Sequence, residues 1–204
     1  VTTIGRIPDY YFQAVGSGTG AIAAWEANQR FIADGRYGGS IMKLMVSQNR
    51  PFTLMYDSWK AGSRELLPLD AAEARRQVEI ISAKVLSNRK PPYSLKGGLF
   101  DALTATKGDM FAATNEEAAA AAALFEKTEG IDIEPAAGVA LASLQQAIAE
   151  GKVEKDATIM LNITGGGVRR FKSEHKLFYK KPDYVFPVDA DPETVKQVVG
   201  ELFG

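Results

Sequence analysis

The sequence predicts an α/β protein with a mainly parallel sheet flanked by helices. Strand-like and helical segments alternate along the chain, and two glycine-rich loops, 16–20 and 164–167, each follow a predicted strand. The segment 157–163 is mainly apolar, as expected of a central parallel strand that is buried on both faces.

The first part of the chain predicts two strand–helix pairs. Aromatic and β-branched residues at 10–15 predict a strand that ends in the first glycine loop. Apolar residues with helical spacing then predict a helix over 21–33. A second strand is expected at 41–46 and a short amphipathic helix at 51–61.

The middle of the chain begins with Asp70, a typical helix N-cap, so we expect one helix over 71–86. The polar, proline-containing segment 87–93 is expected to be a mobile or ligand-binding loop. A helix at 100–105 and a strand at 109–113 follow.

Two alanine-rich helices are expected at 114–125, where the first turn is acidic, and at 134–150, where a proline follows the first residue. The basic, aromatic segment 169–184 is interpreted as a surface hairpin, and 192–203 as a last amphipathic helix. No repeat or linker divides the 204 residues, so one domain is expected.

Composition excludes several classes of protein. With 24 basic and 25 acidic residues the net charge is -1, so neither a nucleic-acid-binding protein nor one held to an anionic membrane is expected. No apolar run approaches the roughly 20 residues that cross a bilayer, and no secretory signal is visible. Without cysteine, and with His175 as the single histidine, no disulfide or metal site is expected, and a cytoplasmic location fits.

The first glycine loop has the composition of a phosphate cradle. Glycines allow backbone amides to converge on one point, two hydroxyl side chains add donors, and the helix that follows contributes its positive end. The residues concerned are Gly16, Ser17, Gly18, Thr19 and Gly20.

Two other interpretations of the first loop stay open: a turn that holds no ligand, and a dinucleotide site. Gly16, Gly18 and Ala21 satisfy the loose G-x-G-x-x-A fingerprint. Against a dinucleotide, the next strand runs into 47–49, which contains no carboxylate for a ribose.

Thr164 opens the second glycine loop, where its hydroxyl is well placed to bond a ring nitrogen of a flat cofactor; the alternative is a flexible turn. Both loops follow the carboxyl ends of parallel strands, so we expect them to lie near each other. Between them in sequence, small residues in 130–137 would let a helix pack closely against the sheet or a cofactor.

In this order, the motifs at 15–20, 130–137 and 162–167 resemble the carboxyl-terminal half of fold-type II pyridoxal-phosphate enzymes, which share the tryptophan synthase β-like fold. Within them the chain is similar to the threonine synthase branch. The segments 87–94 and 96–103 resemble most the cysteate synthase family of that branch. The resemblance covers essentially all 204 residues.

The resemblance implies pyridoxal 5'-phosphate as cofactor, with Gly16, Ser17, Gly18, Thr19 and Gly20 at its phosphate and Thr164 at its pyridine nitrogen. It implies a homodimer that replaces the phosphate of O-phospho-L-serine by sulfite, giving L-cysteate for coenzyme M synthesis in methanogenic archaea. A threonine synthase acting on O-phosphohomoserine, a non-catalytic phosphate-ligand module and a dinucleotide-binding module are the alternatives.

The same resemblance implies that residues 1–204 are the carboxyl-terminal part of a longer enzyme, with most of the large, cofactor-binding domain. In the family, the Schiff-base lysine precedes the phosphate loop, and no counterpart occurs within residues 1–15. Lys96 lies in a similar Ser-x-Lys motif, but on the wrong side of the loop. We therefore expect no catalytic residue in this chain and no turnover by it alone.

Anion-binding side chains are expected because both implied substrates are anions. Arg89 and Lys90 are the favoured substrate-binding residues, since they lie in the loop most particular to the cysteate synthase resemblance. Arg64, Arg169 and Arg170 are weaker candidates.

Overall fold

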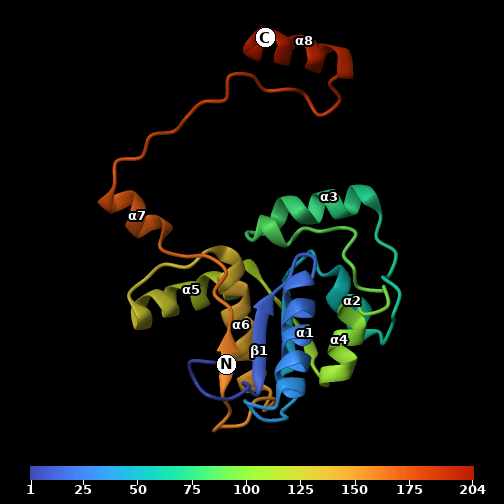
Figure 1. Ribbon diagram of the computed structural model, residues 1–204, viewed down its shortest axis with the longest axis vertical. Coiled ribbons are helices and arrows are strands. Elements are labelled where there is room, and N and C mark those ends of the chain that lie inside the picture. Colours follow the sequence, from blue (N-terminus) through green and yellow to red (C-terminus); the bar gives the residue numbers. More distant parts are fainter. The chain divides into compact units, whose positions relative to one another are not determined.

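The computed structural model describes residues 1–204, and Figure 1 shows the course of the chain. It contains one four-stranded sheet in the order β3-β2-β1-β4. Every neighbouring pair of strands is parallel. The strands are β1 (Tyr10–Ala14), β2 (Lys43–Asn49), β3 (Asp109–Ala113) and β4 (Ile159–Leu161). The predicted fold class, a parallel sheet flanked by helices, is confirmed.

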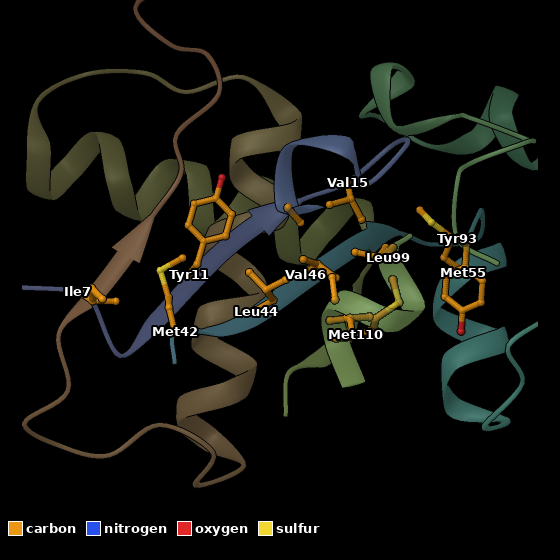
Figure 2. Packing of buried hydrophobic residues seen from close by; sticks show 13 residues of the cluster. Ile7, Tyr11, Val15, Met42, Leu44, Val46, Met55, Tyr93, Leu99 and Met110 are labelled. Carbon is orange, nitrogen blue, oxygen red and sulfur yellow. The ribbon is translucent and has the colours of Figure 1, made fainter. Parts of the chain in front are cut away.

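One face of the sheet packs against α1 (Thr19–Asp34), α2 (Leu54–Lys60) and α4 (Leu99–Thr106). Figure 2 shows the apolar side chains between these layers, with Leu44 and Val46 of β2 near the centre. Side chains alternate along an extended chain, so Tyr11 of β1 and Val15, the residue after β1, point into this layer.

The opposite face packs against α5 (Asn115–Glu129) and α6 (Pro135–Ala149), and Tyr10 and Phe12 of β1 point to this side. Small residues let the two helices approach closely: a Cβ on Gly138 of α6 would lie 2.6 Å from the Ala118 backbone oxygen of α5. The alanine-rich composition of both segments thus allows the two helices to pack closely.

The segment after Asp70 forms a shorter helix than predicted. Asp70 caps α3 (Ala71–Ile80) by accepting from the amides of Ala72 and Glu73, as expected. The helix ends at Ile80, however, and only the short 3-10 helix η1 (Lys84–Leu86) follows. Two asparagine side chains, one at the end of β2 and one at the start of α5, accept from the amides of residues 82 and 83. Their geometry is described below.

The prediction of a central, fully buried strand over 157–163 is wrong. β4 covers only Ile159–Leu161, pairs with β1 alone and is an edge strand whose Met160 side chain is 47% exposed. An uninterrupted apolar run is typical of a central parallel strand, but it does not fix the strand's place in the sheet.

The chain divides into two units, Val1–Phe171 and residues 172–204, and the expected single domain stays a prediction. The predicted hairpin at 169–184 is absent: α7 (Val168–Glu174) begins there and irregular chain follows. The last helix, α8 (Pro192–Phe203), is confirmed and is capped by Asp191. None of the helices combines the length and the apolar composition that a membrane span requires.

Candidate functional site

The two glycine loops leave the sheet at the same edge, on neighbouring strands. Phe12 of β1 pairs with Leu161 of β4, and the amide of Asn162 donates to the Phe12 oxygen at 2.9 Å. The chain reaches Gly16 four residues after Phe12 and Thr164 three residues after Leu161. The expected proximity of the loops therefore follows from the strand register, since paired strands lie about 4.8 Å apart.

The first loop presents unpaired amides at the start of α1. Gly18 is the N-cap residue, in a left-handed conformation (φ 83°), and no side chain caps the helix. The hydroxyls of Ser17 and Thr19 bond to each other at 2.8 Å, and the Thr19 amide makes only a long 3.3 Å contact with the Ser17 hydroxyl. The amides of Gly18, Gly20 and Ala21 have no acceptor within the chain. Such a helix start favours an anion.

The glycines also permit close packing around the loop. A Cβ on Gly16 would lie 2.7 Å from the backbone oxygen of Val85, and one on Gly18 would lie 2.9 Å from the Leu99 side chain. The backbone of 82–86 therefore lies directly against the loop. This contact between distant segments was not predicted.

Two asparagines fix the segment 82–86. The Ala83 amide donates to the Asn49 side-chain oxygen at 3.0 Å, and the Ser82 amide donates to that of Asn115 at 2.8 Å. Asn49 is fully buried at the end of β2, and its own amide donates to the Ala113 oxygen at 3.1 Å. These bonds replace those of a longer α3. Asn49, the last residue of 47–49, therefore has a structural role. The segment offers no carboxylate to a dinucleotide ribose.

Between segment 82–86 and the second glycine loop lies a cavity of about 390 Å³. Thr164 lines it, is exposed and makes no hydrogen bond within the chain, so its hydroxyl is available to a ligand. The helix α6 begins at this cavity, and the Glu134 amide donates to the Gly165 oxygen at 2.9 Å. The lining residues are Ser82, Ala83, Lys84, Val85, Glu134, Pro135, Ala136, Thr164 and Gly165.

Lys84 is the lysine of this cavity, but its amine is already used. The Nζ atom donates to the backbone oxygens of Val78 and Glu79, both at 2.6 Å. These carbonyls belong to the last turn of α3, where a cation is favourable. Lys84 therefore acts as a helix-end cation. Lys96 does not line this cavity either.

These features fit pyridoxal phosphate. The unpaired amides of the first loop suit a doubly charged ester, and Val85 joins that loop to the cavity because it both contacts Gly16 and lines the cavity. The cavity can take a small ring, and Thr164 offers it a free hydroxyl. Residues 16–20 and Thr164 therefore lie on either side of the segment that contains Val85.

Arg89 and Lys90 lie at a different cavity from Thr164. They line one of about 710 Å³, whose other residues include Leu54, Leu66 and Leu67, and neither side chain makes an ion pair. The structure therefore brings the two predicted cations together, but in a separate cavity from the second glycine loop. The remaining arginine candidates are otherwise engaged: Arg64 makes a bidentate pair with Asp101 and Arg169 bonds to Glu126, both at the protein surface.

A half-buried polar chain beside the first loop was missed by the sequence analysis. Asn162 donates from Nδ2 to the Tyr11 hydroxyl at 2.9 Å, and that hydroxyl donates to Oε1 of Gln13 at 3.0 Å. Burial raises the pKa of Tyr11, although the bond from Asn162 works in the opposite direction. The available signal was a glutamine two residues from Tyr11 in a strand of otherwise apolar residues.

Comparisons with known proteins agree with this fold. Residues 1–165 match the family described as pyridoxal-phosphate dependent enzyme. Cysteate synthase of Methanosarcina mazei is 54% identical over 182 residues, which are 89% of this chain and 44% of that protein. Cysteate synthase of Methanocella arvoryzae is 46% identical over 199 residues, 97% of this chain and 48% of that protein. The chain thus spans about half the length of these relatives.

A solved structure supports the same fold class. The crystal structure of a T.th. threonine deaminase matches with a TM-score of 0.54, covering 82% of this chain and 53% of that chain. The sequence identity is 18%, so this likeness concerns the fold alone.

Proposed function

The chain belongs to the family of pyridoxal-phosphate-dependent enzymes, and from this membership we propose that it is part of a cysteate synthase. The reaction is O-phospho-L-serine plus hydrogen sulfite to L-cysteate plus hydrogen phosphate. The C–O bond to the phosphate group breaks and a C–S bond forms at the same carbon. One observation carries the proposal. The loop amides that have no acceptor and the Thr164 hydroxyl that has no partner lie at the same edge of the sheet.

Within this proposal the chain's own residues bind and orient the cofactor. The amides of Gly18, Gly20 and Ala21 hold its phosphate at the start of α1, where the helix dipole favours negative charge. Thr164 donates a hydrogen bond to the pyridine nitrogen. When bound, the cofactor supplies an electron sink for removal of the substrate's α-proton. A hydroxyl in place of a carboxylate leaves the ring nitrogen unprotonated, which moderates that sink.

We propose further that Arg89 and Lys90 recognise the anionic substrates. Both side chains are exposed and without a carboxylate partner, so their charges are available. A guanidinium binds phosphate or sulfite through two parallel hydrogen bonds. Replacing either residue by glutamine in the whole enzyme should raise KM for the anion with little change in cofactor binding.

The relatives are about twice as long as this chain, so the proposed activity belongs to a whole protein. We propose that residues 1–204 form its carboxyl-terminal part and most of the cofactor-binding domain. The lysine that binds the cofactor covalently would then lie outside these residues. The whole enzyme is proposed to be a homodimer, which sedimentation of the full-length protein would test.

Two measurements test the proposal. The chain is first titrated with pyridoxal phosphate and, separately, with a nicotinamide dinucleotide; binding of the dinucleotide alone would overturn it. The full-length protein is then incubated with O-phospho-L-serine and sulfite, and with O-phosphohomoserine, while phosphate release is followed. Release with the first substrate pair supports a cysteate synthase, whereas release with O-phosphohomoserine alone identifies a threonine synthase.

A further inference from the structure

We propose that the side-chain amide of Gln13 is a further donor to the phosphate group at the first glycine loop, and that Tyr11 and Asn162 orient it. This inference rests on the proposed function, because it concerns the same cofactor. It assigns a ligand-binding role to a strand residue outside the glycine loop.

Gln13 lies directly against the first turn of α1. A Cβ built on Gly20 would lie 2.7 Å from Nε2 of Gln13 and 2.9 Å from its Oε1. The backbone amide of Gly20 belongs to the same turn and has no acceptor within the chain. The Gln13 side chain therefore lies beside amides that we assign to the phosphate.

The hydrogen bonds of Tyr11 determine which way the Gln13 amide faces. Tyr11 accepts from Nδ2 of Asn162 at 2.9 Å, so its single proton is free to be donated elsewhere. That proton goes to Oε1 of Gln13 at 3.0 Å. If the Gln13 amide were reversed, two donors would face the phenol oxygen and the phenol proton would lose its acceptor. The oxygen of Gln13 is therefore held at Tyr11.

The two N–H groups of Gln13 are consequently left for a ligand. Nε2 has no acceptor within the chain, although it lies next to the turn that begins α1. A carboxamide whose oxygen is fixed by a buried phenol cannot rotate freely to satisfy these donors. An anion at the glycine loop supplies the acceptor that they lack.

The chain Asn162–Tyr11–Gln13 stays intact at neutral pH. Tyr11 is 5% exposed, and burial raises the pKa of its phenol, so the proton that it donates to Gln13 is retained. Figure 2 shows the Tyr11 ring packed among the apolar side chains near Met42, with its oxygen directed away from them. The ring is thus anchored by packing while its hydroxyl links Asn162, the residue after β4, to Gln13 of β1.

The test measures binding of pyridoxal phosphate, and of pyridoxal as a probe without the phosphate, to the chain and its variants. Gln13→Leu removes the donors, and Gln13→Glu replaces them by a carboxylate that repels the ester. Gln29→Glu is the matched control, because Gln29 is an exposed residue of α1, nine positions beyond Gly20. Phosphorus NMR of the bound cofactor reports on the environment of its phosphate, and circular dichroism shows whether each variant is folded.

We expect both Gln13 substitutions to lower the affinity for pyridoxal phosphate by about tenfold or more, which is typical for loss of a hydrogen bond to a charged group. The affinity for pyridoxal should be unchanged in the Gln13 variants, and Gln29→Glu should bind pyridoxal phosphate as the unsubstituted chain does. The phosphorus resonance of the cofactor bound to the Gln13 variants should shift. Tyr11→Phe should lower the affinity for pyridoxal phosphate less than the Gln13 substitutions do, because Gln13 is kept but is no longer oriented. This variant also serves as the test if the Gln13 variants fail to fold.

Three results would overturn the inference. One is an affinity for pyridoxal phosphate within about twofold of the unsubstituted chain, with an unchanged phosphorus resonance. Another is an equal loss of pyridoxal and pyridoxal phosphate binding, which would place Gln13 away from the phosphate. The third is that the unsubstituted chain binds pyridoxal phosphate no better than pyridoxal. The glycine loop would then not bind the phosphate, which refutes this part of the proposed function and the inference with it.

Discussion

Replacing Asp109 by asparagine should lower the free energy of unfolding at neutral pH. In acid the substitution should have no effect. Asp109 begins β3, and its carboxylate accepts from Lys60 at 2.7 Å, from Lys152 at 2.8 Å and from the Trp59 indole at 3.0 Å. The side chain is only 22% exposed. Asparagine keeps the size of the side chain but removes the charge that both lysines meet.

The size of the effect follows from the pKa of Asp109. Burial alone would raise this pKa, but the bonds from Lys152, Lys60, the Met110 amide and Trp59 lower it from 3.8 to about 2. This lowering of the pKa corresponds to about 2.5 kcal/mol of folding free energy at neutral pH. Because the pKa is lower in the folded protein, this stability is complete above about pH 5 and is lost as the pH falls towards about 2.

Urea unfolding of the chain and of Asp109→Asn at several pH values between 7 and 3 measures this contribution. The two midpoints should differ most at pH 7 and converge as the pH falls below 4. Glu26→Gln is the matched control, since Glu26 lies 3.9 Å from Arg30 on the surface and should change stability by less than about 0.5 kcal/mol. A difference between wild type and Asp109→Asn that stays constant over this pH range would refute the electrostatic explanation.

Three further substitutions test the packing around the site. Gly16→Ala places a methyl group 2.7 Å from the Val85 oxygen, so pyridoxal phosphate affinity measured by absorbance titration should fall about tenfold or more. Asn49→Ala leaves the Ala83 amide without its acceptor; amide exchange at 82–86 should accelerate, and urea unfolding should show a loss of about 1–3 kcal/mol. Gly138→Ala forces α5 and α6 apart, and calorimetry should show a lower Tm than for Gly200→Ala, where the exposed helical glycine has nothing within 4 Å.

The elements on either side of the first glycine loop were predictable because they depend on local pattern. Three aromatic residues at 10–12 begin β1, and helical spacing after the loop produces α1. The shared edge of the two glycine loops was predictable as well, since it requires only that both strands be parallel. A local sequence pattern and one topological rule thus located this part of the site.

The rest depended on contacts between distant segments. Nothing local shows that Asn49 and Asn115 draw the chain at 82–83 away from α3, which is why that helix was predicted too long. The apolar run at 157–163 could not show that β4 lies at the edge of the sheet. The Tyr11–Gln13 bond joins two residues of one strand, but its importance depends on Asn162 and Gly20. Long-range pairing therefore limited the prediction.

The central claim is that one small molecule is held at both ends, by the first glycine loop and by Thr164. Amide NMR of the chain during titration with pyridoxal phosphate tests it most directly. We predict that the resonances of Gly18, Gly20, Ala21 and Thr164 all shift, with the same dissociation constant. Shifts confined to the glycine loop, or found instead at Arg89, would contradict the account.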